Sequence, residues 1–275
     1  MAITADTRAV AVSTHIIVES AMETPVAQPT PLEAEAPGPL NALVRRVSGK
    51  HQYFLPASGE PFGADRFSRP ARIAKRVLDL VVVVMLLVLG IPVLILAAVA
   101  IKLDSGGPVL FSQQRVGRRG RIFRIVKLRT MFVNNDESAH ADYVARLIRG
   151  EAEQQAGGMF KLTADPRITR VGSVLRKLSI DELPQVINIL RGDMSVVGPR
   201  PALPREVELY DERALQRLVV RPGLTGLWQV SGRSQLTFQE MVDLDIAYWE
   251  RWSLLRELMI LVKTPAAVLA KKGAA

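Results

Sequence analysis

The longest apolar run in the chain extends from Leu80 to Ile101 and contains no charged residue. As a straight helix it would be about 33 Å long, enough to cross a hydrocarbon core ~30 Å thick. Gly90-Ile91-Pro92 lies at its centre, where proline removes a backbone hydrogen bond and bends a helix. Each arm then measures roughly 15 Å and reaches only halfway across. The pattern therefore fits two structures, a kinked spanning helix and a re-entrant hairpin whose ends lie on one side.

Basic residues flank both ends of this run, and the positive-inside tendency would place both ends in the cytoplasm. This favours the hairpin, but prolines are common in spanning helices, so the sequence leaves both structures open. The flanking residues are Arg66, Arg69, Arg72, Lys75 and Arg76 before the run, and Lys102, Arg115, Arg118 and Arg119 after it.

Short strands and helices are predicted after the apolar run. Residues 109–115 and 121–128, joined by Gly117-Arg-Arg-Gly120, predict a hairpin. The last apolar segment, 249–272, contains Trp249 and Trp252 and fits either a helix on the bilayer interface or an ordinary core helix. Helices are predicted for 134–155, 168–178, 182–191, 204–219 and 238–250, the last with a capping box from Thr237 to Glu240.

Residues 1–65 hold seven of the 17 prolines and no sustained apolar period, which predicts a disordered N-terminal tail. We expect residues 66–102 to form the basic flank and a re-entrant membrane helix, and residues 103–275 a cytosolic or interfacial catalytic domain. The predicted fold class is α+β and mainly helical, a monotopic membrane protein with a Pro-broken helix at Pro92 and a small catalytic domain.

Composition narrows the chemistry. The net charge of +9 favours an anionic partner, and the absence of cysteine excludes disulfides and thiolate catalysis. With only three histidines, a metal would need oxygen ligands, which indicates Mg²⁺ or Mn²⁺. The N-terminus does not resemble a secretory signal, so we expect the chain to start in the cytosol.

Two adjacent carboxylates, Asp181 and Glu182, precede a helical repeat of apolar residues that ends at Gly192. Pro184 is best tolerated in the first turn of a helix, which would put both carboxylates at its positive end. Ser179 and Glu182 also match a capping box, and on the dipeptide alone that structural explanation is the stronger one.

Cationic residues near the pair change this balance. Arg176 and Lys177 precede it, and Arg200 lies between two prolines, which favours a side chain held in a fixed direction. The alternative for Arg200 is a plain turn with a surface arginine. A phosphate ~4 Å from a carboxylate meets repulsion of about 4 kcal/mol per charge pair at a dielectric of ~20, so a diphosphate needs compensating cations there. Arginines and a divalent ion would supply them, and an aspartate so placed can attack phosphorus.

Three blocks carry a resemblance to a known family: Asp165 to Pro201, Lys127-Leu-Arg-Thr-Met131, and Arg221 to Arg233. Together they resemble the bacterial sugar transferase family, the monotopic polyprenol-phosphate hexose-1-phosphate transferases, over about residues 70 to 270. The family's membrane helix is re-entrant and broken at Ser-Pro, whereas this chain has Ile91-Pro92, so the freed carbonyl lacks a hydroxyl partner.

The resemblance implies transfer of hexose-1-phosphate from a UDP-sugar to undecaprenyl phosphate with release of UMP. It implies a ping-pong route through a phosphosugar-aspartyl enzyme, with Asp181 as nucleophile, Glu182 completing the dyad and Mg²⁺ near both. Phosphate-binding residues would be Arg176, Arg200, Lys127 and Arg129, and the nucleotide-side candidates Gln229, Ser231 and Arg233. We expect the bacterial inner membrane as location, with the active site on its cytoplasmic face and membrane lipids as partners. The product would start exopolysaccharide or lipopolysaccharide repeat units for downstream glycosyltransferases.

Other functions share parts of this pattern. A membrane-bound phosphohydrolase would use the same carboxylates and Mg²⁺, with water as acceptor. A noncatalytic scaffold would tolerate Asp181→Asn. A nucleic-acid partner is not predicted, because aromatic residues make up 5% and no RNA- or DNA-binding signature is present.

Overall fold

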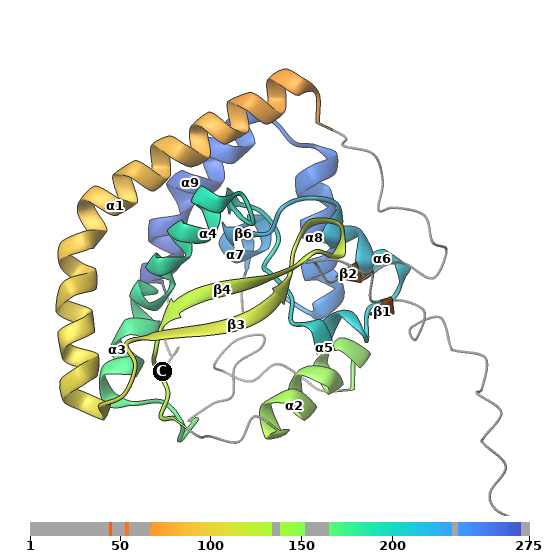
Figure 1. The fold of residues 1–275 in the computed structure, drawn as a ribbon. Helices are drawn as coiled ribbons and strands as arrows, with labels where there is room; N and C mark the ends of the chain where they lie inside the picture. The colour runs from red at the N-terminus through yellow and green to blue at the C-terminus, as the bar shows by residue number, and fades with distance from the viewer. Residues whose placement is uncertain are drawn as a thin grey trace, which may run out of the picture. The chain divides into compact units, whose positions relative to one another are not determined.

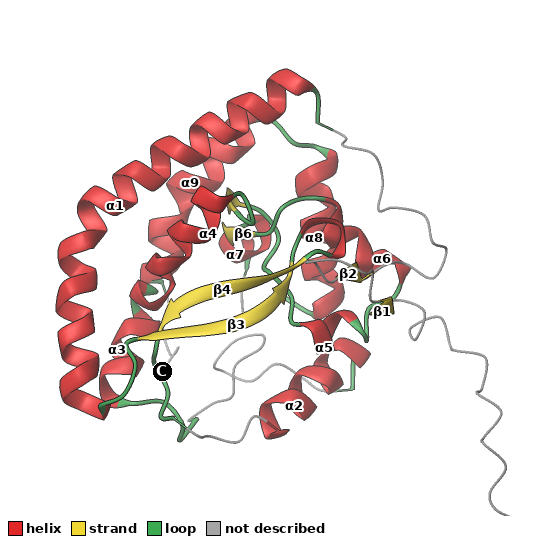
Figure 2. Ribbon diagram, in the orientation of Figure 1, coloured by secondary structure: helices red, strands yellow, loops and turns green. Residues whose placement is uncertain are grey.

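The computed structural model describes residues 44–45, 53–54, 67–133, 138–151, 165–232 and 236–270. Most of these residues are helical, and the described strands form three two-stranded sheets (Figures 1 and 2). The prediction of a mainly helical α+β fold is confirmed. The predicted tail lies outside the described residues except for β1 (Val44–Arg45) and β2 (Tyr53–Phe54), which pair antiparallel.

The apolar run forms the central part of α1 (Arg69–Ser105), a single helix that continues through Pro92. Ser68 caps its start by accepting from the Ala71 amide at 3.3 Å. At about 55 Å along its path, α1 is longer than a hydrocarbon core is thick. It is the one helix in the described part of the chain that is long and apolar enough to cross a membrane, and its ribbon changes direction near the middle (Figure 1). Pro92 lies inside this helix and does not end it, and the re-entrant topology stays a prediction.

Both arms of α1 pack against the rest of the protein, although most of its apolar side chains are exposed. On the first arm, Asp79 is buried and bonds to β5 (Ser195–Val197). On the second arm, Ala97 and Ile101 share an apolar cluster with Leu128 and Leu175. Both arms therefore contact one catalytic unit.

The predicted hairpin is confirmed. Strands β3 (Leu110–Val116) and β4 (Ile122–Leu128) pair antiparallel, with Leu110 opposite Leu128 and Val116 opposite Ile122. The connection contains the 3₁₀ turn η2 (Arg118–Gly120), in which Arg119 has a φ of 57°. The hairpin carries Lys127 toward the carboxylate pair.

The predicted helices are confirmed in part. The capping box that opens α8 (Phe238–Glu250) is present, since Thr237 and Glu240 bond reciprocally. The single helix predicted for 182–191 is wrong in its first half, which is the 3₁₀ turn η3 (Ile180–Gln185), because Pro184 limits the backbone bonds available there. The helix predicted for 204–219 is divided into three short elements. The remaining helical elements are α2 (Ser138–Arg149), α3 (Arg170–Lys177), α4 (Val186–Arg191), α5 (Pro204–Val207), α6 (Glu212–Leu215), η4 (Gln216–Val219), α7 (Leu227–Ser231) and α9 (Leu254–Leu269).

A parallel pair between β5 and β6 (Gly223–Thr225) was not predicted, because each strand has only three residues. The backbones approach each other very closely at Gly198, directly after β5, and Gly223 in β6. A Cβ on Gly223 would lie 2.1 Å from the Gly198 nitrogen, and one on Gly198 would lie 2.4 Å from the Arg221 carbonyl oxygen. Only glycine fits at these two positions. Their close approach brings the Pro199-Arg200-Pro201 segment against the block that begins at Arg221.

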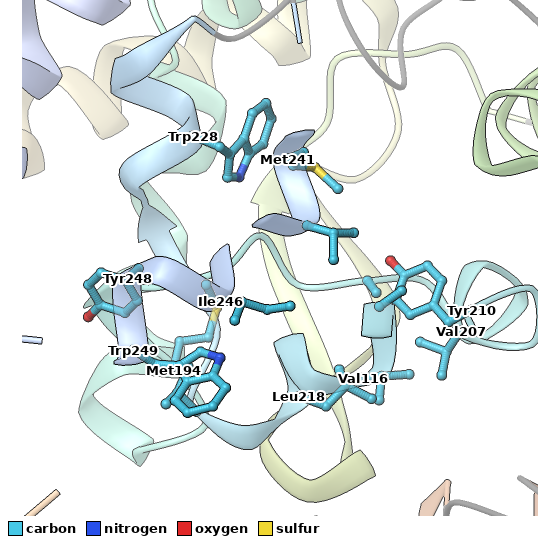
Figure 3. Packing of buried hydrophobic residues seen from close by; sticks show 14 of the residues in the cluster. Val116, Met194, Val207, Tyr210, Leu218, Trp228, Met241, Ile246, Tyr248 and Trp249 are labelled. Carbon is cyan, nitrogen blue, oxygen red and sulfur yellow. The ribbon is translucent and has the colours of Figure 1, made fainter. Parts of the chain in front are cut away.

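The main core surrounds β5 and α8, where Met194, Ile246, Tyr248 and Trp249 pack together (Figure 3). Trp249 is 4% exposed and therefore belongs to the core rather than to an interface. Helix α9 buries Glu257 and Ile260 on one face and exposes apolar side chains on the other. The exposed ones include Leu255, Val262 and Leu269.

Candidate active site

The carboxylate pair lies in η3, directly after a turn made by Ser179 with a φ of 57°. The Ser179 side chain makes no cap hydrogen bond. The carboxylate of Glu182 instead accepts from Lys127 Nζ at 2.8 Å. The capping-box explanation of this dipeptide is therefore wrong. Asp181 is 8% exposed, whereas the Glu182 side chain is 34% exposed, so the pair combines a sheltered and an accessible carboxylate.

Asn188 fixes the position of the pair relative to β4. It is fully buried on α4, accepts from the Val126 amide at 3.2 Å and donates to the Arg124 carbonyl at 2.7 Å. Amide side chains that satisfy both a strand donor and a strand acceptor hold two elements in one register. This register brings Lys127 of β4 to Glu182.

Arg176 in α3 is coupled electrostatically to the pair. Burial lowers the pKa of its guanidinium, and the charges of Asp181 and Asp165 act in the opposite direction. Asp165 accepts two hydrogen bonds from the Arg167 guanidinium, at 2.8 and 2.7 Å, and these hold the pKa of Asp165 below its usual value. The charges of two carboxylates therefore favour the ionised form of Arg176, and one of the two belongs to the predicted nucleophile.

Gly172 allows α3 to approach the strand segment that follows β4. A Cβ at this position would lie 2.1 Å from the Thr130 carbonyl oxygen, a distance that no side chain allows. The Thr169 amide donates to that same oxygen at 3.0 Å, and Ile168 pairs with Met131. The block that begins at Asp165 therefore runs alongside residues 130–132.

Arg200 is paired rather than solvated. Its Nη1 and Nη2 lie 3.0 and 3.3 Å from the two carboxylate oxygens of Glu206, which is fully buried at the start of α5. Burial raises the pKa of Glu206, but the charges of Arg200 and Arg115 outweigh it, and the net shift is downward. The bidentate pair fixes the direction of the Arg200 side chain.

Two further buried arginines hold the backbone of the Pro-Arg-Pro segment. Arg115 of β3 donates to the Pro201 carbonyl at 3.0 Å, and Arg217 lies 3.5 Å from the Arg200 carbonyl and is paired with Asp245 at 2.7 Å. Burial, followed by the charge of Arg200, lowers the pKa of Arg115 to about 10, while Glu206 and Glu182 raise it.

The other predicted site residues are placed as follows. Arg129 is buried at the carboxyl end of α1, where it donates to Ser105 and Gly106. Gln229 is half-buried and donates to the Leu224 carbonyl at 3.4 Å, and Ser231 is exposed at the end of α7. Arg233 lies outside the described residues. The structure thus brings Lys127 to Glu182, and the roles of the other predicted phosphate-binding and nucleotide-side residues stay predictions.

Sequence reasoning missed Glu206, Arg115 and Asp79. The first had a signal, because Pro204 followed by Glu206 is typical of a helix start with an acidic third residue. Asp79 also had one, since a carboxylate at the edge of an apolar run is costly unless it is bonded. Arg115 had none, because its role depends on strand pairing that brings Val116 opposite Ala202.

The residues of the pair fit a divalent metal of the magnesium class. Mg²⁺ prefers carboxylate oxygens and commonly uses one or two of them, with phosphates and water completing six ligands. Among the residues that the structure describes, no group of three or more His, Cys, Asp or Glu side chains could hold a metal. Asp181 and Glu182 would then hold Mg²⁺ with water or phosphate oxygens as the other ligands.

Comparisons with known proteins identify the family of this chain. The family model described as "Bacterial sugar transferase" matches residues 70–271. The exopolysaccharide production protein ExoY of Rhizobium meliloti is 44% identical over 200 residues, which cover 73% of this chain and 87% of that protein. The UDP-glucose:undecaprenyl-phosphate glucose-1-phosphate transferase of Caulobacter vibrioides is 44% identical over 208 residues, covering 73% and 71%. The undecaprenyl-phosphate galactose phosphotransferase of Salmonella typhimurium is 42% identical over 208 residues, covering 75% and 42%.

The chain belongs to the bacterial sugar transferase family. The predicted family and the prediction that the chain is an enzyme are both confirmed.

Proposed function

We propose that this enzyme transfers hexose-1-phosphate from a UDP-hexose to undecaprenyl phosphate and releases UMP. Relatives with more than 40% identity are named for undecaprenyl-phosphate as acceptor and for galactose or glucose as the sugar. The ExoY relatives are named for exopolysaccharide production, which supports a product that starts polysaccharide repeat units for downstream glycosyltransferases.

The observation that carries this proposal is the contact between the catalytic turn and α1. Gly90, at the midpoint of the helix, is buried, and a Cβ there would lie 3.6 Å from Leu183 Cδ1. Leu183 follows the Asp181-Glu182 pair directly. The turn that carries Asp181 therefore packs against α1, the proposed lipid-contacting helix. Transfer to a phosphate on a lipid requires such proximity.

The chemistry has two displacements at one phosphorus atom. A carboxylate oxygen of Asp181 attacks the β-phosphorus, the bond from that phosphorus to the bridging oxygen breaks, and UMP leaves with the bridging oxygen. A phosphate oxygen of undecaprenyl phosphate then attacks the same phosphorus and releases the Asp181 carboxylate. Lys127, Arg176 and Arg200 are assigned to stabilise the phosphate charges, which matters because the carboxylates alone would repel the donor by several kcal/mol.

Magnesium is proposed as cofactor, held by Asp181 and Glu182 together with donor phosphates. When bound, it supplies positive charge to the phosphate oxygens and so lowers the cost of bringing a diphosphate to the carboxylates. Lys127 Nζ donates to Glu182 Oε1 at 2.8 Å.

A re-entrant topology in the bacterial inner membrane, with the active site on the cytoplasmic face, is part of the proposal. The first arm of α1 bonds to β5 and α4, and the second arm packs against β4 and α3. Both arms contact one folded unit, which is difficult to reconcile with a helix whose ends lie on opposite sides of a bilayer. Exposed apolar side chains along α1 and α9 supply the lipid-facing surface.

The topology can be tested directly because the chain has no cysteine. Single cysteines at Arg69 and Lys102, both exposed near the ends of α1, would be treated with a membrane-impermeant maleimide in inverted inner-membrane vesicles. A re-entrant helix predicts labelling of both variants. Labelling of only one would show that α1 spans the membrane.

The activity is tested with purified protein, UDP-glucose or UDP-galactose, Mg²⁺ and undecaprenyl phosphate, with UMP as the readout. We expect repeated turnover, with more than one UMP per active site, only when the lipid is present, and no UMP from Asp181→Asn. Repeated turnover without the lipid would favour the phosphohydrolase. If several UDP-sugars gave no UMP, the proposal would be wrong.

A further inference from the structure

Arg129 is the least satisfied buried cation in the described part of the chain. Its side chain is 6% exposed, and only Nη2 donates, to Ser105 Oγ at 3.1 Å and to the Gly106 carbonyl. Nε and Nη1 are buried and have no hydrogen-bond partner among the described residues. A buried guanidinium with two nitrogens, and so three N–H groups, unused costs more than a solvated one, so its retention calls for an anionic partner.

The surroundings of Arg129 lie at the carboxyl end of the membrane helix and are apolar and exposed. A Cβ on Gly107 would lie 3.1 Å from Arg129 Nη1 and 3.6 Å from Val133 Cγ2, so these three residues are neighbours. Gly106 faces open space. Exposed apolar side chains follow on the adjacent chain segments, namely Leu103, Leu110, Phe111, Phe132 and Val133.

The position is also near the proposed reaction. Arg129 follows Leu128, whose side chain shares an apolar cluster with Ile180, the residue before Asp181. In extended chain, alternate residues lie on one face about 6.6 Å apart, and Lys127, two residues earlier, reaches Glu182. An anion at Arg129 is therefore close to the dyad and beside the carboxyl end of α1.

A carboxylate near this position is already engaged. Asp104, in the last turn of α1, accepts from the Val171 amide at 3.1 Å at the start of α3. The hydrogen bonds of Arg129 go to Ser105 and Gly106 and not to Asp104. Among the described residues, no carboxylate is hydrogen-bonded to the Arg129 guanidinium.

We propose that Arg129 binds the phosphate of a membrane lipid, with the exposed apolar side chains around it in contact with the acyl or prenyl chain. A fork of N–H groups suits a phosphate, and an apolar rim at a membrane helix suits the chain attached to it. The kinetic test of this inference rests on the proposed function. The inference assigns Arg129 to a lipid phosphate and not to the UDP-sugar. The phosphate comes either from the polyprenyl phosphate acceptor or from a bilayer phospholipid.

The test compares Arg129→Gln and Arg129→Lys with Arg124→Gln, which removes an exposed arginine of the same strand. Initial rates would be measured in mixed micelles while undecaprenyl phosphate and UDP-sugar are varied separately, with either phosphatidylcholine or phosphatidylglycerol as carrier. If the acceptor is the ligand, Arg129→Gln raises the KM for undecaprenyl phosphate at least roughly tenfold and leaves the KM for UDP-sugar unchanged. Arg129→Lys falls between, and Arg124→Gln resembles the wild type.

If a phospholipid is the ligand, the wild type is activated by phosphatidylglycerol, and Arg129→Gln loses this activation at an unchanged KM for the acceptor. A second measurement does not use turnover: thermal stabilisation by a short-chain polyprenyl phosphate or by phosphatidylglycerol, present in the wild type and absent in Arg129→Gln. If neither lipid shows an Arg129-dependent effect, or if both substrates are affected alike with a lower Tm, Arg129 is only a helix cap and the inference is wrong. Failure of the wild type to release UMP would instead count against the proposed function.

Discussion

Asp79 fastens the first arm of α1 to the strand that leads into the Pro-Arg-Pro segment, and its removal has a calculable cost. The carboxylate is 2% exposed and accepts from Ser195 Oγ at 2.8 and 3.0 Å and from the Val196 amide at 2.9 Å. In Asp79→Ala both donors stay buried without an acceptor. Each such group costs about 1–3 kcal/mol, so we expect a loss of about 2–6 kcal/mol in the free energy of unfolding.

Unfolding would be followed in a non-ionic detergent by denaturant titration and by thermal scanning. For a folded unit of this size, a loss of 1 kcal/mol lowers Tm by about 2–4 °C, so Asp79→Ala should melt at least about 4 °C lower. The matched control is Asp243→Ala, because Asp243 pairs with Arg213 on the surface and both side chains are more than half exposed. That control should cost less than about 1 kcal/mol.

A double-mutant cycle with Ser195→Ala separates this bond from general destabilisation. Ser195→Ala in the Asp79→Ala background removes one orphaned donor, so the two substitutions should be less than additive by about 1–2 kcal/mol. A loss below about 1 kcal/mol in Asp79→Ala, or strict additivity, would refute the reasoning.

Three other substitutions separate pairing, acid stability and catalysis. Glu206→Gln leaves the Arg200 guanidinium without its counter-charge, so it should lower the free energy of unfolding by about 3–5 kcal/mol and reduce UMP release. A variant as stable as the wild type in denaturant titration would contradict the pairing. Asp165→Asn should change the dependence of stability on acid. Arg167 holds the pKa of Asp165 low in the folded state, so this carboxylate stabilises the wild type above the unfolded pKa of about 4, and the stabilisation is lost as pH falls. The Tm of the variant should therefore change less than that of the wild type between pH 5 and 3. An unchanged pH profile would count against this. Lys127→Gln should cost less than about 1 kcal/mol, since its ion pair is partly exposed, yet lower kcat/KM by roughly 10²-fold; parallel losses of stability and activity would indicate a structural role only.

The sequence allowed prediction of elements whose signal is local. The apolar run, the β3–β4 hairpin and the capping box at Thr237 depend on neighbouring residues, and all three are present. The boundary of the catalytic helix was predicted less well, because Pro184 gives a 3₁₀ turn rather than a first α-helical turn.

Features set by contacts between distant segments were not predictable in this way. The β5–β6 pair joins residues more than twenty positions apart through strands of three residues, too short for any alternation to show. The partner of Arg200 and the orientation of Arg115 depend on that pairing and on the hairpin. The basic residues near Asp181 and Glu182 identified this pair in the sequence as a candidate site. The ion pair between Lys127 and Glu182, which argues against a capping box, forms only in the folded chain.

The central claim, that Asp181 carries the phosphosugar, is tested most directly by following a label during one half-reaction. Purified enzyme with Mg²⁺ would be mixed with UDP-hexose labelled in the sugar, without lipid acceptor, and then given undecaprenyl phosphate. We expect about one UMP per active site before lipid is added, with the label bound to protein, followed by its transfer to lipid. Asp181→Asn should show neither step. Lipid-dependent UMP release from the wild type without any protein-bound label would contradict the covalent route and assign Asp181 another role.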